Sequence, residues 1–398
     1  MAFKHSTDKL FTTKYGEPYL WGSGDVTTTT SNENKITASD GATSDSFGSS
    51  VAIGSGRIVV GAYGDDTSQG SAYIFDLDGT QLAKITASDG AAGDQFGWSV
   101  AIGNGRIVVG AKGDDDNGNS SGSAYIFNLS GTQLAKITAS DGAAFDFFGS
   151  SVAVGNGRIV VGTIDRYYNN GTNGAIYIYD LNGTQLAKIT ASDGAANDAF
   201  GDRIAIGNGR IVVGALNDDD NGTSSGSAYI FDLDGTQLAK ITASDGTDYD
   251  FFGSSVAVGN GRIVVGAIGD DDNGSASGSA YIFDLDGTQL AKITASDGAT
   301  NLNFGHSVSI VNGRIVVGEN NSISSSQGSV YIFDLDGNQL EKITASDGVI
   351  ADFFGFSVAI GNGRIVVGAK GVNSSQGAAY IYNTPRVYTP YDLIYNEV

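Results

Sequence analysis

The sequence predicts an all-β protein in which seven four-stranded antiparallel blades form a closed β-propeller. A unit of about fifty residues is written seven times, and repeats of this length are typical of stacked or circular arrays. Each unit contains four short apolar runs separated by turn residues, and a piece of the last unit lies ahead of the first. We therefore expect one repeat domain over residues 31–383, flanked by an N-terminal segment 1–30 and a C-terminal tail 384–398.

The order of strands within a unit follows from its turn residues. In the second copy, residues 99–103 and 106–111 flank an Asn-Gly pair, which is preferred in two-residue type I′ hairpin turns. Residues 123–128 form a third run, and residues 133–139 form a fourth after another short turn. These runs are apolar on both faces, so we expect neighbouring sheets to pack face to face, as propeller blades do.

The ends of the repeat array indicate how the ring closes. The sequence KITASDG of the fourth run occurs at residues 35–41, ahead of the first Phe-Gly pair, while the last unit stops after its third run at residues 380–382. We expect the N-terminal segment to supply the fourth strand of the last blade. A closed ring needs no capping repeat, whereas an open array would expose two apolar ends.

Three kinds of repeated side chain have structural interpretations. The Phe of each Phe-Gly pair and the Tyr-Ile-Phe run are predicted core between blades. The Arg after each hairpin turn is expected to pair across strands within its own blade, Arg57 with Asp76 and Arg210 with Asp232. The Lys of the fourth run, such as Lys84, is interpreted as a charge that keeps an edge strand from pairing with another sheet.

Composition excludes several classes of function. The formal charge is −22, with 22 Lys and Arg against 44 Asp and Glu, so we expect no nucleic acid partner. No apolar run approaches the roughly 18 residues of a membrane span, so we expect no membrane insertion. The absence of Cys excludes disulfides and thiol nucleophiles. The N-terminal residues also lack the apolar stretch of a secretory signal.

The Phe-Gly opening, the VVGA strand and the SAYIF strand resemble FG-GAP repeats, the unit of integrin α-type seven-bladed propellers and of many bacterial and phage proteins. The resemblance covers roughly residues 35–383. Integrin-type copies carry a calcium loop, Asp-x-Asp-x-Asp-Gly, between the first two strands. Here that connection is only Gly-Asn-Gly-Arg, so the chain resembles a short variant that lacks the usual calcium loop.

Acidic clusters lie instead between the second and third runs, and two interpretations remain open. Calcium prefers six to eight oxygen ligands, which three consecutive aspartates in a short loop cannot all supply to one ion. The alternative is that these residues are solvated turn formers. No cofactor is required under this second interpretation, and calcium is the cation predicted under the first. The candidate ligands are Asp114, Asp116, Asp218, Asp220, Asp270 and Asp272.

Catalysis is not expected. The chain has two histidines, His5 and His306, and neither lies in a motif that supplies a nucleophile, a base and an orienting group. The carboxylates repeat with the fold, so no pair is distinguished as the acid and base of a glycosidase.

Departures from the repeat predict a binding surface. Aromatic residues and Arg, which recognition surfaces favour, break the pattern in the third and fourth units and at isolated positions elsewhere. Sequence drift under weak constraint is the alternative. The predicted binding residues are Arg166, Tyr167, Tyr168, Asp202, Arg203, Tyr249, Phe145 and Trp98.

Both terminal segments are predicted to anchor the protein to a partner. Every proline lies in them, at Pro18, Pro385 and Pro390, and both segments are rich in aromatic residues that disordered extensions normally lack. The predicted anchoring residues are Phe11, Tyr15, Tyr19, Leu20, Trp21, Tyr388, Tyr391, Leu393 and Tyr395.

The leading functional hypothesis is a non-catalytic structural or adhesion propeller on the surface of a phage virion, as a fibre, knob or decoration protein. Virion proteins need no secretory signal. The tails would bind other structural proteins of the particle, in one or several copies, and the propeller would bind a host-surface glycan or protein. This step is an analogy at the level of the fold. The alternatives are a secreted FG-GAP adhesin on the bacterial cell surface that binds calcium and glycan or protein, and a propeller hydrolase or lyase.

Overall fold

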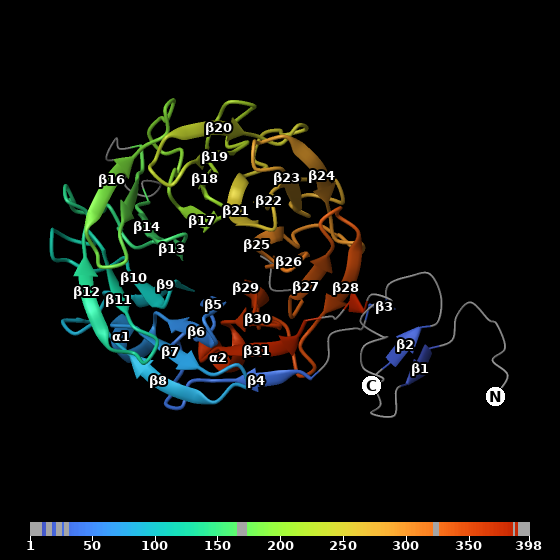
Figure 1. Ribbon diagram of the computed structural model, residues 1–398, viewed down its shortest axis with the longest axis horizontal. Helices are drawn as coiled ribbons and strands as arrows, with labels where there is room; N and C mark the ends of the chain where they lie inside the picture. The colour runs from blue at the N-terminus through green and yellow to red at the C-terminus, as the bar shows by residue number, and fades with distance from the viewer. Residues whose placement is uncertain are drawn as a thin grey trace, which may run out of the picture.

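Seven four-stranded antiparallel sheets stand around a central axis in this computed structural model (Figure 1). The structure describes residues 32–164, 173–320 and 326–384 in full. It also describes the backbone of four short terminal strands, β1 (Leu10–Thr12), β2 (Pro18–Leu20), β3 (Val26–Thr27) and β32 (Val387–Tyr388). The predicted all-β, seven-bladed propeller is confirmed.

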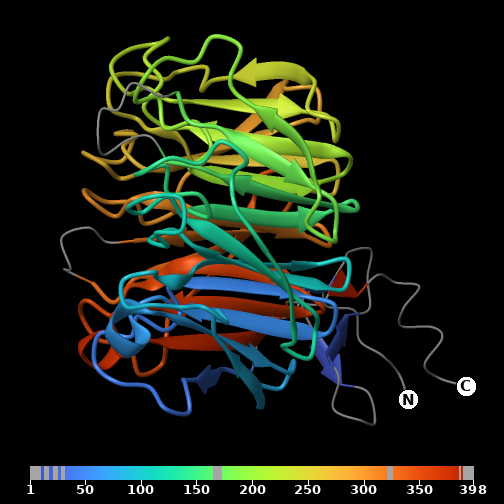
Figure 2. The same ribbon diagram turned by 90° about the vertical axis from the view of Figure 1, so that its left-hand side faces the viewer.

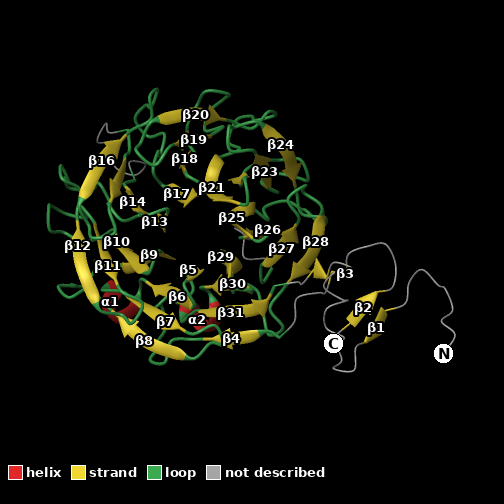
Figure 3. Ribbon diagram, in the orientation of Figure 1, coloured by secondary structure: helices red, strands yellow, loops and turns green. Residues whose placement is uncertain are grey.

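Each blade consists of four adjacent strands, and in every blade the first strand lies nearest the axis (Figures 1 and 3). Blade 1 holds β5 (Ser50–Gly54), β6 (Arg57–Ala62), β7 (Ser71–Phe75) and β8 (Gln81–Ile85); blade 2 holds β9 (Phe96–Gly103), β10 (Arg106–Ala111), β11 (Ser123–Phe127) and β12 (Gln133–Ile137). Blade 3 holds β13 (Ser151–Gly155), β14 (Arg158–Gly162), β15 (Ile176–Tyr179) and β16 (Gln185–Ile189); blade 4 holds β17 (Arg203–Gly207), β18 (Arg210–Ala215), β19 (Ser227–Phe231) and β20 (Gln237–Ile241). Blade 5 holds β21 (Phe252–Gly259), β22 (Arg262–Ala267), β23 (Ser279–Phe283) and β24 (Gln289–Ile293); blade 6 holds β25 (Phe304–Val311), β26 (Arg314–Glu319), β27 (Ser329–Phe333) and β28 (Gln339–Ile343).

Blade 7 contains strands from both ends of the chain. It holds β29 (Phe354–Gly361), β30 (Arg364–Ala369), β31 (Ala378–Asn383) and, as its outer strand, β4 (Asn34–Ile36). β4 runs antiparallel to β31, with Lys35 opposite Tyr380. The predicted closure of the ring by the N-terminal segment is therefore consistent with the observed pairing.

The turns have the predicted chemistry. Asn104 and Gly105 both have positive φ, 50° and 74°, which is the type I′ conformation that matches the twist of a hairpin. Two single-turn helices, α1 (Asp65–Ser68) and α2 (Val372–Ser375), lie between the second and third strands of blades 1 and 7.

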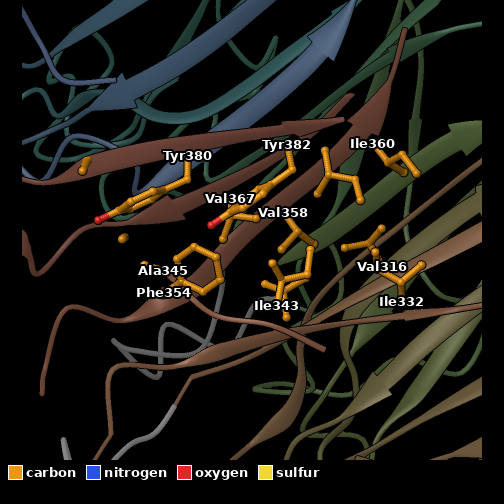
Figure 4. Close-up of a cluster of buried hydrophobic side chains, with 14 of the residues drawn as sticks. Val316, Ile332, Ile343, Ala345, Phe354, Val358, Ile360, Val367, Tyr380 and Tyr382 are labelled. Carbon is orange, nitrogen blue, oxygen red and sulfur yellow. The ribbon is translucent and has the colours of Figure 1, made fainter. Parts of the chain in front are cut away.

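The core lies between the blades. Seven clusters of buried side chains each join one blade to the next, and Figure 4 shows the cluster between blades 6 and 7. In that cluster Phe354 is fully buried and meets Tyr380 edge to face, with ring centres 5.3 Å apart. The same contact recurs in blade 1, where the Phe47 and Tyr73 ring centres lie 5.4 Å apart. The predicted burial of these aromatic residues is confirmed.

Each Phe-Gly pair brings the backbones of neighbouring blades into direct contact. Phe148 N donates to Ser121 O, 2.9 Å away in the preceding blade. Gly149 follows with φ +89°, and a Cβ at this position would overlap the carbonyl oxygen of Ser123. Only glycine allows both this backbone conformation and this close approach.

The repeated arginines do not pair within their own blades. Arg210 Nη2 lies 3.7 Å from Asp286 Oδ1 of the next blade, and Arg364 Nη2 lies 3.3 Å from Asp78 Oδ1. Asp76 instead accepts from the backbone N–H groups of its own turn, at Asp78 and Thr80. The predicted pairs Arg57 with Asp76 and Arg210 with Asp232 are wrong, because short-range turn capping takes the acidic partner first.

The strands run between two different ends of the ring (Figure 2). We call the end with the Asn-Gly turns, such as residues 104–105, the turn end. The other end, which carries the connections between blades and those between second and third strands, such as residues 86–95 and 63–70, is the loop end. Asn383, the last residue of β31, is paired with Arg364, so the chain leaves blade 7 at the turn end.

We predict that Gly149→Ala is much more destabilising than Gly157→Ala. Gly157 also has positive φ, +77°, but a Cβ there would meet open space. The control should cost about 1–2 kcal/mol from backbone strain alone. Overlap with Ser123 should bring the loss at Gly149 to roughly 4 kcal/mol. Chemical denaturation measures both values, and equal losses would show that the close approach between blades carries no energetic weight.

Candidate functional site

A cavity of about 270 Å³ opens on the axis of the propeller, and it is lined from all seven blades. Its wall is formed by residues at the start of each first strand, just after the Phe-Gly pair, at the loop end. In blade 5 these are Ser255 and Val256, and in blade 7 Phe356, Ser357 and Val358. The Phe-Gly contacts fix the first strand of each blade against that of the next blade. The backbone of the cavity wall is therefore the same in every blade, and the blades differ there mainly in their side chains.

One side of the cavity carries a stack of three side chains. Trp98 and Tyr63 line the cavity with ring centres 4.8 Å apart. Lys112 Nζ lies 3.0 Å from the centre of the Trp98 ring. An ammonium group over an indole face is attracted by the ring quadrupole, so Lys112 holds a positive charge beside the cavity.

A second stack lies in blades 6 and 7. Lys370 Nζ is 3.5 Å from the centre of the Phe356 ring, and the His306 ring centre is 4.9 Å from that of Phe356. Burial, together with the positive charges of Arg203 and Lys370, lowers the pKa of His306 to about 3, so its imidazole is neutral at pH 7. Burial lowers the pKa of Lys370 to about 8, so its ammonium is mostly protonated at pH 7.

Arg203 is held in place from two sides. Its Nε donates to Ser254 O of the next blade at 3.0 Å, and its Nη1 lies 3.1 Å from Asp202 Oδ1. Asp202 is 2% exposed, whereas the Arg203 side chain is 37% exposed. The carboxylate therefore supports the guanidinium from within the blade, and Arg203 reaches the cavity wall.

The structure brings together only part of the predicted binding set. Trp98 and Arg203 line the cavity, and Asp202 contacts Arg203. Phe145 and Tyr249 do not line it: they lie on connections between blades, and Tyr249 is 58% exposed. The remaining three predicted residues, Arg166, Tyr167 and Tyr168, lie outside the described residues.

Sequence reasoning missed five residues of the two stacks, and their register could have found them. His306 and Phe356 occupy the position directly after Phe-Gly, as Trp98 does. Tyr63, Lys112 and Lys370 occupy the first position after the second strand. Departures directly after Phe-Gly or directly after the second strand therefore lie at the cavity or beside it.

The acidic loops surround the repeated lysines. Lys136 Nζ lies 2.8 Å from Asp89, 2.9 Å from Asp114 and 2.5 Å from Asp116. Tyr125 Oη also lies 2.9 Å from Asp114 Oδ2. Although burial works in the opposite direction, the hydrogen bonds from Lys136 and Tyr125 hold the pKa of Asp89 below its usual value. Lys136 therefore forms structural ion pairs. This role is additional to the predicted one of keeping the outer strand from pairing with another sheet.

The other predicted metal ligands have the same arrangement. Lys240 Nζ lies 2.9 Å from Asp218 and 2.5 Å from Asp220, and Lys292 Nζ lies 2.7 Å from both Asp270 and Asp272. Oxygens of Asp245, Asp270 and Asp272 come within 4.8 Å of one another, a spacing that could hold a metal ion. A cation at the centre of such a group would have to displace the lysine ammonium.

Blade 6 reaches the same arrangement from a different backbone position. Its second strand ends in Glu319, where blades 1 and 2 have Ala, and Glu319 is 2% exposed. Its Oε2 lies 3.0 Å from Tyr331 Oη, which matches the contact between Asp114 and Tyr125 in blade 2. Burial raises the pKa of Glu319. Glu319 therefore makes the tyrosine contact that a loop aspartate makes in blades 2, 4 and 5.

The predicted anchoring residues are described only as backbone, and only in part. Phe11 pairs with Tyr19 between β1 and β2, and Leu20 lies in β2 opposite Leu10. Tyr388 pairs with Val26 between β32 and β3, so the two terminal segments form a sheet with each other. The remaining anchoring residues, Tyr15, Trp21, Tyr391, Leu393 and Tyr395, lie outside the described residues.

These blades and their Phe-Gly contacts define a seven-bladed β-propeller of repeated units. The chain belongs to the FG-GAP repeat family: the family model matches residues 30–75, 80–127, 132–179, 184–231, 236–283, 288–333 and 338–382. The short connection after each first strand fits the variant without the usual calcium loop. No curated protein matches the chain. Fold and family indicate a non-catalytic binding or structural propeller.

Among the described residues, none of the helices has the length and apolar character needed to span a membrane.

We predict that Lys136→Met destabilises the protein more than Lys188→Met at pH 7. The Lys136 side chain is 18% exposed and contacts three carboxylates, whereas that of Lys188 is 40% exposed and contacts Asp141. Removing Lys136 leaves Asp114, itself 3% exposed, without its counterion, which should cost about 3 kcal/mol. The loss at Lys188 should be about 1 kcal/mol or less.

The difference between the variants should depend on pH. Against the effect of burial, Lys136 helps to hold the folded pKa of Asp89 below the unfolded value of about 3.9, so its contribution to stability is complete above that value. The loss caused by Lys136→Met is therefore complete at neutral pH and shrinks as pH falls through the lowered folded pKa of Asp89. Urea unfolding at pH 7 and in acid below that pKa measures this, and a loss that is constant with pH would contradict the ion-pair role.

Proposed function

We propose that this protein is a non-catalytic structural or adhesion propeller on the surface of a larger particle, a phage virion in particular, as a fibre, knob or decoration protein. Both terminal segments would bind other structural proteins of the particle, in one or several copies. The loop end would face outward and bind a host-surface glycan or protein.

One observation carries the proposal: the two terminal segments begin on the same end of the ring. β31 ends at the turn end beside Arg364, and β4 starts there opposite Ile381. Beyond the propeller the two segments pair through β3 and β32. An anchor on the turn end would leave the cavity and the loops free at the opposite end.

Charge supports the choice of partners. A formal charge of −22 produces net repulsion from nucleic acids and from anionic membranes, so we propose neither as a partner. High net charge also keeps many copies soluble and prevents nonspecific association when a protein is displayed on a particle.

A secreted adhesin on the bacterial cell surface is the alternative, and particle association separates it from the virion proposal. We expect the chain to sediment with particles purified from its native source in a density gradient. An amine-reactive cross-linker should join the tail residues Lys4, Lys9 or Lys14 to other particle proteins. Lys136 and Lys240, whose ammonium groups are held in ion pairs on the propeller, serve as the internal comparison.

A soluble chain whose cross-links all fall within itself would overturn the virion proposal and favour the free adhesin. Cross-links to particle proteins from the propeller lysines alone would overturn the assignment of the tails as anchors.

We also propose that the propeller requires no metal, because lysine ammonium groups neutralise its acidic loops. Millimolar CaCl₂ should then leave the melting temperature of the chain unchanged, and a chelator should have no effect. A calcium-dependent rise in melting temperature that the chelator reverses would contradict this, because a ligand that binds only the folded state must stabilise it. Such a rise would support calcium binding by the acidic loops, Asp270 and Asp272 among them.

A further inference from the structure

The lysines and arginines that do not belong to the repeat gather at the axial cavity. Within residues 32–384 the repeat places one Arg after each hairpin turn and one Lys on each outer strand, and four basic residues lie outside these positions, Lys112, Arg166, Arg203 and Lys370. Arg203 and Lys370 line the cavity, and Lys112 lies on the ring of Trp98, which lines it too. Arg166 is outside the described residues.

This part of a strongly acidic chain carries local positive charge. None of the described residues that line the cavity is Asp or Glu. Arg203 pairs with Asp202, which is 2% exposed and does not line the cavity. The neutral His306 beside Lys370 adds no charge at pH 7. The positive groups at the cavity favour an anionic ligand.

The rest of the wall favours a ligand that carries hydrogen-bond donors. A serine hydroxyl has one donor and two acceptor sites. Ser99, Ser307 and Ser357 line the cavity, and each donates at 2.8 Å to the Phe-Gly carbonyl of the next blade. Ser255 does the same at 2.6 Å. Their donors are used within the protein, so toward the cavity these oxygens can only accept.

The volume of the cavity and the aromatic residues on its wall restrict the class of ligand further. About 270 Å³ lies just below the usual range of ligand pockets, roughly 300–1,000 Å³, and suits a molecule about as large as one sugar ring. Trp98, Tyr63 and Phe356 supply apolar surface on the wall, which suits the C–H faces of such a ring.

We propose that the axial cavity binds a small polyhydroxylated carboxylate, a sugar acid of one ring, with its carboxylate on Arg203 and Lys370 and its hydroxyl groups donating to the serine oxygens. A neutral sugar lacks the group that the cations would bind. A simple inorganic anion lacks the set of hydroxyl donors that the serine oxygens can accept.

The repeat itself supplies substitutions that preserve the fold. Blade 5 has Ser254 and Ser255 where blade 4 has Asp202 and Arg203, so the double variant D202S/R203S restores the side chains of a neighbouring blade. Ile268 occupies the position of Lys370 in blade 5, so K370I does the same. K188M removes a lysine far from the cavity, on outer strand β16, and is the matched control for loss of a positive charge.

The test is isothermal titration calorimetry, in which the full chain is titrated separately with D-galacturonate, D-galactose and inorganic phosphate. We expect galacturonate to bind, and galactose and phosphate to bind at least tenfold more weakly. D202S/R203S and K370I should each weaken galacturonate binding at least tenfold, and K188M should leave it unchanged. Circular dichroism and melting temperature verify that each variant is folded.

A second measurement places the ligand. The chain has two tryptophans, Trp21 and Trp98, so W21F leaves Trp98 as the sole indole. The fluorescence of Trp98 should change as galacturonate is added, with a midpoint at the Kd that calorimetry gives.

The proposal would be overturned by no galacturonate binding to the folded chain, by equal binding of galactose, or by binding that the cavity variants leave intact. Phosphate binding as tight as that of galacturonate would also overturn it and make the cavity a general anion site. The inference goes beyond the display role and does not depend on it, because particle association tests the tails and this titration tests the cavity.

Discussion

The close backbone approach at each Phe-Gly pair is the constraint on which the rest of the structure depends. Two glycines meet there from adjacent blades: a Cβ on Gly61 would overlap the carbonyl oxygen of Gly97, and one on Gly368 would overlap that of Gly48. The second of these contacts joins blade 7 to blade 1. The same contact therefore sets the angle between every pair of blades and closes the ring.

Because this contact is made by backbone, it leaves the next side chains free to differ. Trp98, His306 and Phe356 follow three of the Phe-Gly pairs, and small Ser follows others, at one position of one scaffold. Five of the seven positions directly after Phe-Gly line the axial cavity, and in blades 4 and 5 the next residue, Arg203 or Ser255, lines it instead. A ring of near-identical blades can therefore carry an asymmetric site without any change in the packing between blades, since the buried Phe and Tyr rings of the core stay the same.

The charged residues of the propeller form two groups, those that recur in the repeat and those that lie at the cavity. Many carboxylates of the loop end have a fixed local role, because they hold the outer-strand lysine and the hydroxyl of the buried Tyr, as Asp89 and Asp114 do in blade 2. Blade 6 makes this plain, because Glu319 restores the contact with Tyr331 from the strand, where the usual loop aspartate is missing. The contact keeps its place in space while its position in sequence changes, so it depends on the carboxyl group and not on the loop that usually carries it. The cations at the cavity lie outside the repeated positions and have local contacts of their own, Arg203 with Asp202 and Lys370 with the ring of Phe356.

Short-range chemistry explains what the sequence could predict. The Asn-Gly turns predict the hairpins, and the alternation of apolar runs predicts the blades, because both depend on residues close in sequence. The copy of the outer strand ahead of the first unit predicts the strand exchange, because the last unit lacks its own fourth strand. The pairing of Arg210 could not be predicted in the same way. Asp232 was already used by its own turn, and the observed partner, Asp286, lies one blade further on.

The location of the cavity could not be predicted from residues that are close in sequence. Trp98 and Arg203 are departures from the repeat, but they meet at one cavity only because the seven blades surround one axis. Phe145 and Tyr249 are departures too, yet they lie on connections between blades and not on the cavity wall. What separates the two groups is register: Trp98, His306 and Phe356 share one position after Phe-Gly, and Tyr63, Lys112 and Lys370 share another after the second strand. In a repeat protein, position within the unit is therefore a stronger guide to a site than residue type, because the fold converts equal register into equal distance from the axis.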